Sequence, residues 1–181
     1  MSSASIRLSS IRSKVFWNSL LAFGFALTVG IGAQLKVFLP GNPVPMTFQT
    51  LFLLIGASYL HRFYSLQMAG WYLLLGVAGF PLFANGSSGL NYLFGPTGGY
   101  LLGFILAAGL LGFFKPASGW RQLLLFLFAH SIIFIPGLLW LKVVTGASWP
   151  QTLQMGLYPF LIGDLLKSAI AFTVSRFYWK P

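Results

Sequence analysis

The segment from Pro159 to Phe172, PFLIGDLLKSAIAF, places an aspartate and a lysine three residues apart among apolar side chains. Asp164 is the only acidic residue of the 181, and Lys167 shares its face if the segment is helical. An ionised carboxylate accepts hydrogen bonds from N–H donors, and an ammonium group donates them to carbonyl or carboxylate oxygens. The pair could therefore form an internal salt bridge, or it could bind the polar groups of a small ligand.

Two physical costs favour the ligand-binding interpretation of Asp164 and Lys167. A charge at the centre of a membrane costs about 2.5–3.5 kcal/mol on insertion scales. A buried ion pair often only offsets its own desolvation, so it adds little stability. We therefore expect the pair to hold a small solute that carries an amide-like group on an apolar body.

The composition indicates an all-α integral membrane protein. The chain is 57% hydrophobic and only 7% charged, against about 25% charged residues in soluble domains. Its net charge of +10 comes from basic residues scattered singly along the chain, whereas nucleic-acid binding requires them clustered on one face. One aspartate and two distant histidines provide no base–nucleophile set, so we expect no enzyme, no cofactor and no metal site. His130 is expected to be a packed or pore-facing histidine.

Charge-free runs predict six membrane-spanning helices, since about 20 apolar residues cross the hydrocarbon core. The run after Phe63 is too long for one helix, and its Gly-, Pro- and Asn-rich middle predicts a long loop instead. A kink is expected at Pro136. The expected spans are Val15–Leu35, Thr47–Leu60, Tyr64–Gly79, Gly98–Phe114, Gln122–Leu141 and Leu157–Phe177.

Loop charges give the expected orientation. With the N-terminus inside, eight basic residues fall on the inner side and two, Lys36 and Lys142, on the outer side, which agrees with the positive-inside rule. We therefore expect a cytoplasmic tail at 1–14, one six-helix domain at 15–178 and a cytoplasmic end at 179–181. The protein would be a multi-pass protein of a bacterial inner membrane with both termini in the cytoplasm. The inner basic residues are Arg7, Arg12, Lys14, Arg62, Lys115, Arg121, Arg176 and Lys180.

Three irregular segments fall on the outer side in this topology: Pro40–Thr50, Phe80–Thr97 and Thr145–Thr152. Irregular backbone at membrane depth persists only where it is buried in protein or lines a cavity. We expect the uncharged middle segment to fold onto the bundle as a lid or wall of an outward-facing pocket. Asn85 and Asn91 would supply hydrogen-bonding groups there. The alternative is an ordinary connecting loop with aromatic interface anchors.

The first expected helix carries a ridge of small residues, with Ala22, Ala26 and Gly30 recurring every four positions. Such ridges let helices approach closely in lipid. The ridge could pack within the bundle, or it could dock a partner subunit.

Four motifs resemble the BioY family, the biotin-binding S components of energy-coupling factor transporters. In order along the chain they are PVPMTFQTL, GVAGFPLFANGSSG, GPTGGYLLGF and PFLIGDLLKSA. The resemblance implies a six-helix S component whose outward-facing pocket captures biotin, with Asp164 and Lys167 contacting the ligand. It also implies that Ala22 and Ala26 dock a coupling transmembrane subunit, which works with two ATPases.

The resemblance extends the expected ligand site to the segments around the pair. Gln49, Asn85, Asn91, Gly98, Gly99 and Tyr100 would line or cap the pocket. Some family members carry an arginine in the Gly-rich loop that can meet the biotin carboxylate, but this chain has NGSSG there. Lys167, glycine N–H groups and Asn85 remain as partners for that carboxylate.

The sequence contains no G-x-x-x-x-G-K-[ST] motif for binding ATP, so the chain itself is not expected to hydrolyse ATP. ATP-driven uptake would therefore need partner ATPases. Two alternatives stay open: a self-sufficient transporter that uses the same pocket, and a small membrane scaffold that transports nothing.

Overall fold

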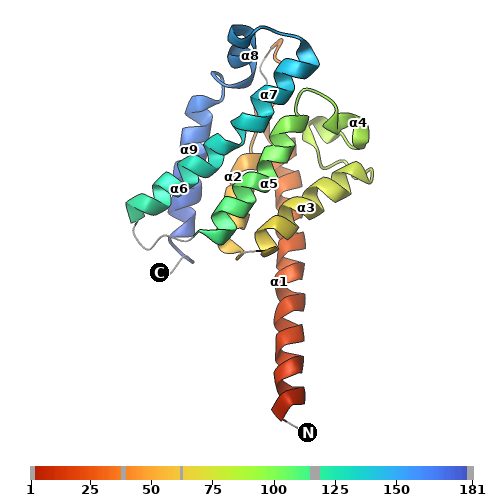
Figure 1. Ribbon diagram of the computed structural model, residues 1–181, viewed down its shortest axis with the longest axis vertical. Coiled ribbons are helices and arrows are strands. Elements are labelled where there is room, and N and C mark those ends of the chain that lie inside the picture. The colour runs from red at the N-terminus through yellow and green to blue at the C-terminus, as the bar shows by residue number, and fades with distance from the viewer. Residues whose placement is uncertain (1–2, 38–39, 62, 115–118, 179–181) are drawn as a thin grey trace.

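The computed structural model describes residues 3–37, 40–61, 63–114 and 119–178, and for residues 3–11 the backbone alone. The described chain is mainly helical, with helices packed side by side around α5 and with α1 extending beyond the others at its N-terminal end (Figure 1). The C-terminal end 179–181 and the basic residues Arg62, Lys115 and Lys180 lie outside the described residues.

The main helices lie where the apolar runs predict them. The helix α1 begins at Ser3, so the expected tail at 3–14 is continuous with the first helix. The fifth expected span is interrupted at Ile133, close to the expected kink, because Pro136 cannot donate to the helix ladder. The bounds are α1 Ser3–Gln34, α2 Gln49–Tyr59, α3 Phe63–Val77, α5 Gly98–Phe113, α6 Gly119–Ile132, α7 Phe134–Thr145 and α9 Leu161–Ser175.

Short elements connect these helices at one end of the molecule, where α4 and α8 lie (Figure 1). The strands β1 (Lys36–Val37) and β2 (Met46–Thr47) pair antiparallel. The long loop after α3 contains the 3₁₀ turn η1 (Ala84–Gly86) and the one-turn helix α4 (Leu90–Leu93). These elements form the rim above the helical core.

The helix α8 (Trp149–Gly156) corrects the prediction of an irregular segment before the last span. Its start is defined by Ser148, whose backbone N–H donates to Gln151 Oε1 at 3.0 Å, and by Pro150 in the first turn. Both features are typical helix N-terminal signals. The last helix consequently begins at Leu161 and not at Leu157.

Length and apolar character identify two described stretches that could cross a membrane, Arg12–Gln34 and Gly119–Thr145, the second of which comprises α6 and α7. A third span is possible if α8 and α9, bent by 45°, act together. The helices α2 and α5 are apolar but shorter. The structure therefore supports an apolar helical bundle, whereas the count of six spans stays a prediction.

Close contacts between α5 and α7 depend on glycine. A Cβ on Gly99 would lie 2.2 Å from the carbonyl oxygen of Pro136, and a Cβ on Gly137 would lie 2.5 Å from the Tyr100 ring. Neither distance is possible for real atoms. The two helices can therefore approach closely enough to place Tyr100 in the interior.

The small-residue ridge of α1 faces the core. Ala22 and Ala26 are completely buried, in a helix that packs on α2 and α3. A docking face must be accessible to the partner, so this arrangement fits the packing interpretation and contradicts the docking role in this structure. The open face of α1 is a different one, where a Cβ on Gly24 would meet nothing within 4 Å.

Candidate ligand-binding site

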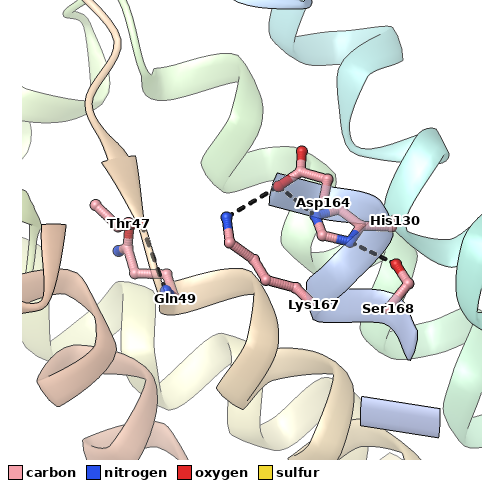
Figure 2. Close-up of polar contacts among 6 residues, drawn as sticks. All are labelled: Thr47, Gln49, His130, Asp164, Lys167 and Ser168. Atoms are coloured by element: carbon pink, nitrogen blue, oxygen red, sulfur yellow. Dashed lines mark hydrogen bonds and ion pairs between the residues drawn. The ribbon is translucent and has the colours of Figure 1, made fainter. Parts of the chain in front are cut away.

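A cluster of ionisable side chains joins α9 to α6. Lys167 Nζ donates to Asp164 Oδ1 at 2.9 Å, as the i,i+3 spacing predicts (Figure 2). Asp164 lies in the first turn of α9, where unpaired N–H groups and the helix dipole favour a negative charge. Both side chains are nearly buried, with 8% of Lys167 and 12% of Asp164 exposed.

His130 completes this cluster from α6. Its Nε2 lies 3.2 Å from Asp164 Oδ1, in ion-pair contact without full hydrogen-bond geometry. Its Nδ1 lies 2.8 Å from the hydroxyl of Ser168, one turn after Asp164 (Figure 2). His130 is packed, as expected, but its contact with the acidic residue was not predicted.

Both contacts to Asp164 use the same carboxylate oxygen, Oδ1. Among the described residues, Oδ2 has no side-chain partner. An ionised carboxylate has acceptor sites on both oxygens. The cluster can therefore hold Asp164 in place by one oxygen and offer the other to a ligand.

The cluster lies in the wall of a cavity that contains about 570 Å³ of empty space, its open mouth included. Most of the lining is apolar or aromatic, contributed by Val44, Pro45, Tyr92, Tyr100, Leu101, Phe104, Ile133, Phe134 and Phe160. A ligand with an apolar body and a few polar groups fits this environment.

Gln49 and Thr47 form the polar wall opposite the cluster (Figure 2). Gln49 Oε1 accepts a hydrogen bond from Thr47 Oγ1 at 2.8 Å, and Gln49 Nε2 donates to the Tyr72 hydroxyl. Both groups of the Gln49 amide are thus held by protein partners, so the side chain is fixed in orientation. Nearby, the buried Thr50 Oγ1 has no hydrogen-bond partner among the described residues. Thr50, which the sequence analysis missed, lines the cavity with an available hydroxyl.

The long loop folds onto the bundle, as predicted. Phe83 is completely buried and stacks on Tyr92 with ring centroids 4.9 Å apart and planes 16° apart. Gln34 fixes the loop from the end of α1: its Nε2 donates to the Phe83 carbonyl at 3.0 Å and its Oε1 accepts from Gly86 N–H at 2.9 Å. The loop thereby places Tyr92 in the cavity wall.

The other expected site residues are divided between the cavity and the packing around it. Tyr100 lines the cavity, and its hydroxyl donates to the Gly156 carbonyl at 2.9 Å. Gly98 and Gly99 are buried against α7 and do not line the cavity. Asn85 and Asn91 are exposed, and Asn85 accepts a hydrogen bond from Lys36. In this structure neither asparagine reaches the cavity, because the loop turns both outward.

The fold and the site together define a class: a helical membrane protein with a mostly apolar cavity for a small molecule and one convergent group of charged side chains. The sequence comparisons specify the family. Residues 5–181 match the profile of the BioY family, and the chain belongs to that family.

Relatives in other organisms agree with the match. The chain is 32% identical over 164 residues to "Biotin transporter BioY2" of Lactococcus lactis, with 87% of each protein covered. It is 35% identical over 150 residues to "Biotin transporter BioY" of Thermotoga maritima, with 81% of this chain and 86% of that protein covered. The fold is similar to a crystal structure of "the S-component for biotin from an ECF-type ABC transporter", with a TM-score of 0.82, 21% identity and 91% of each chain covered.

Proposed function

We propose that this protein captures biotin for uptake across the cytoplasmic membrane. The observation that carries the proposal is the Asp164–Lys167 pair, which lies in the wall of an otherwise apolar cavity and leaves one carboxylate oxygen unused. Relatives that cover most of the chain are named biotin transporters. Biotin combines a polar ureido group with an apolar ring and chain, which matches this distribution of polar and apolar lining.

The proposed recognition uses complementary hydrogen bonds. The ureido N–H groups donate to Asp164 Oδ2, and the ureido carbonyl accepts from Lys167 Nζ. Hydrogen bonds to charged groups contribute about 1.5–3 kcal/mol each. The apolar ring and chain of biotin lie against the aromatic side chains of Tyr92, Tyr100, Phe104 and Phe134, and Thr50 provides a further hydroxyl.

The protein acts as a binding subunit in this proposal and catalyses no reaction. Its sequence contains no ATP-binding motif, and we propose that partner ATPases, reached through a coupling transmembrane subunit, hydrolyse the ATP. The solved protein of similar fold is named as a component of such an assembly.

The proposed topology has six spans within residues 15–178, both termini in the cytoplasm and the cavity open to the outside. The helices at 49–59, 63–77 and 98–113 are short for a span. Tilt and local thinning of the bilayer accommodate short spans at modest cost. The distribution of basic residues supports the orientation.

Equilibrium binding of labelled biotin to the detergent-purified protein tests the proposal. We expect saturable one-to-one binding that excess unlabelled biotin displaces and that thiamine and riboflavin do not. A folded protein that does not bind biotin would overturn the proposal. Biotin uptake is then measured in cells that lack the coupling subunit and the ATPases, to test whether transport requires these partners. Uptake without them would favour a self-sufficient transporter.

A further inference from the structure

The ionisable groups at the cavity leave the carboxylate of an anionic ligand without a counter-charge. Apart from His130, the described residues that line the cavity include one basic side chain, Lys167, and one acidic side chain, Asp164. The charges of these two side chains cancel. Lys36 and Lys142 lie near the rim, but neither is among the residues that line the cavity. A bound carboxylate would therefore give the site a net negative charge in surroundings of low polarity, which is unfavourable.

His130 is the group that can supply the missing charge. Histidine is the side chain that ordinarily changes charge between about pH 5 and 8. Its Nε2 is already 3.2 Å from the Asp164 carboxylate. The other titratable groups at the cavity among the described residues are Tyr92 of α4 and Tyr100 of α5, while α2 and α7 line it with none.

The contact between His130 and Ser168 accommodates both charge states. When the ring is neutral with its proton on Nε2, the Ser168 hydroxyl donates to Nδ1 over the 2.8 Å that separates the two atoms. When the ring is protonated, Nδ1 carries a proton and the same hydroxyl rotates to accept it. The change therefore requires the rotation of one hydroxyl and no movement of α6 or α9.

A second, smaller cavity also borders His130. It contains about 280 Å³ of empty space, lies on the flank between α6 and α9 and shares His130, Phe134 and Asp164 with the ligand cavity. Ser131 and Ser168 give it polar lining, and the exposed Leu161 and Leu165 stand at its edge.

We propose that His130 takes up a proton when the cavity captures an anionic ligand, so that binding is proton-coupled. The inference rests on the proposed function, with biotin as the anion. The complex then holds more protons than the free protein and ligand. Binding strengthens as pH falls and weakens by up to about tenfold per pH unit as pH rises, as uptake of one proton requires.

Calorimetric titration of the purified protein with biotin in phosphate and in Tris measures this proton directly, because the two buffers release protons with different enthalpies. We expect an uptake of up to about one proton per biotin near neutral pH, and none with the uncharged ligand biotin amide. His130→Gln should abolish the uptake and flatten the pH dependence of the dissociation constant. The matched control is His61→Gln, at the exposed turn between α2 and α3, which should retain both.

The outcomes separate this inference from the proposed function. Biotin binding without proton uptake at any pH between about 6 and 8.5 would overturn the coupling and leave the function standing. Uptake that persists in a folded His130→Gln protein, or that is equal for biotin and its amide, would overturn the role of His130 or of the carboxylate. The comparison of the two ligands uses the wild-type protein, so it holds even if the His130 variant does not fold. Absence of biotin binding by the folded wild type would overturn the function itself.

Discussion

Lys167 Nζ lies 2.9 Å from Asp164 Oδ1, and both residues extend from one side of α9 into the wall of the cavity. The contact neutralises two charges that would each be costly in this environment. It also fixes which oxygen of Asp164 remains available, because His130 approaches the same Oδ1. In the proposed function, stability and ligand recognition therefore depend on the same carboxylate.

Asp164→Asn should weaken biotin binding by about 1.5–3 kcal/mol, or roughly 10- to 150-fold. Asparagine removes the charge and presents an amide N–H₂ where the ligand needs an acceptor. Equilibrium binding of labelled biotin measures the change. Thr173→Ala, an exposed position on the same helix, is the control and should bind as the wild type does. Equal affinity of Asp164→Asn and wild type would exclude the carboxylate from recognition.

The pair can be tested for stability independently of the ligand. Lys167→Met leaves the buried carboxylate with His130 alone, so the unfolding free energy should fall by up to about 3–5 kcal/mol. Asp164→Asn combined with Lys167→Met removes both charges and should recover part of that loss. Thermal unfolding of the three variants in one detergent gives the comparison. A double variant less stable than Lys167→Met alone would show that the ion pair is not the source of the effect.

Local patterns in the sequence predicted the helices and the Asp164–Lys167 contact, because both depend on residues close in the chain. An i,i+3 spacing places two side chains on one helix face whatever surrounds the helix. His130 contacts the same carboxylate from another helix, and that contact depends on how α6 and α9 rotate against each other. No spacing in the sequence carries that information.

The incorrect predictions for the α1 ridge and for Asn85 also arise because local sequence does not determine how a segment is oriented in the fold. The helix α1 has no single apolar face, so composition did not indicate which face packs inward, and Ala22 and Ala26 are on the buried one. Asn85 was expected at the pocket because it lies in the right loop. A left-handed turn with φ of 64° directs its side chain toward Lys36 instead.

Gly76→Ala should disturb the cavity through Phe83. An added Cβ would lie 2.2 Å from the Phe83 ring, which stacks on the cavity-lining Tyr92. Overpacking of this kind costs about 1–3 kcal/mol. We expect a lower melting temperature and weaker biotin binding, both measured on the purified protein. Gly70→Ala is the matched control in the same helix, since its Cβ would meet nothing within 4 Å; similar losses in both variants would contradict the prediction.

Gln34→Leu should loosen the loop that carries Tyr92. The substitution removes the bonds to the Phe83 carbonyl and the Gly86 N–H and leaves an apolar side chain that is one atom shorter. Each lost hydrogen bond costs about 0.5–1.5 kcal/mol. We expect faster amide hydrogen exchange in residues 80–89 and faster release of biotin. Gln154→Leu, at an exposed glutamine of α8, should change neither; unchanged exchange in Gln34→Leu would show that the loop is held by its aromatic packing alone.

The two faces of α1 should respond differently to the same enlargement. Ala26→Leu adds bulk at a completely buried position, so the unfolding free energy should fall by about 1–3 kcal/mol. Gly24→Leu adds more atoms two residues away, but its Cβ meets nothing within 4 Å and leucine favours the helix more than glycine does. Thermal unfolding should therefore show a loss for Ala26→Leu and none for Gly24→Leu. The opposite order would mean that the ridge of Ala22 and Ala26 is open, and would restore it as a docking surface.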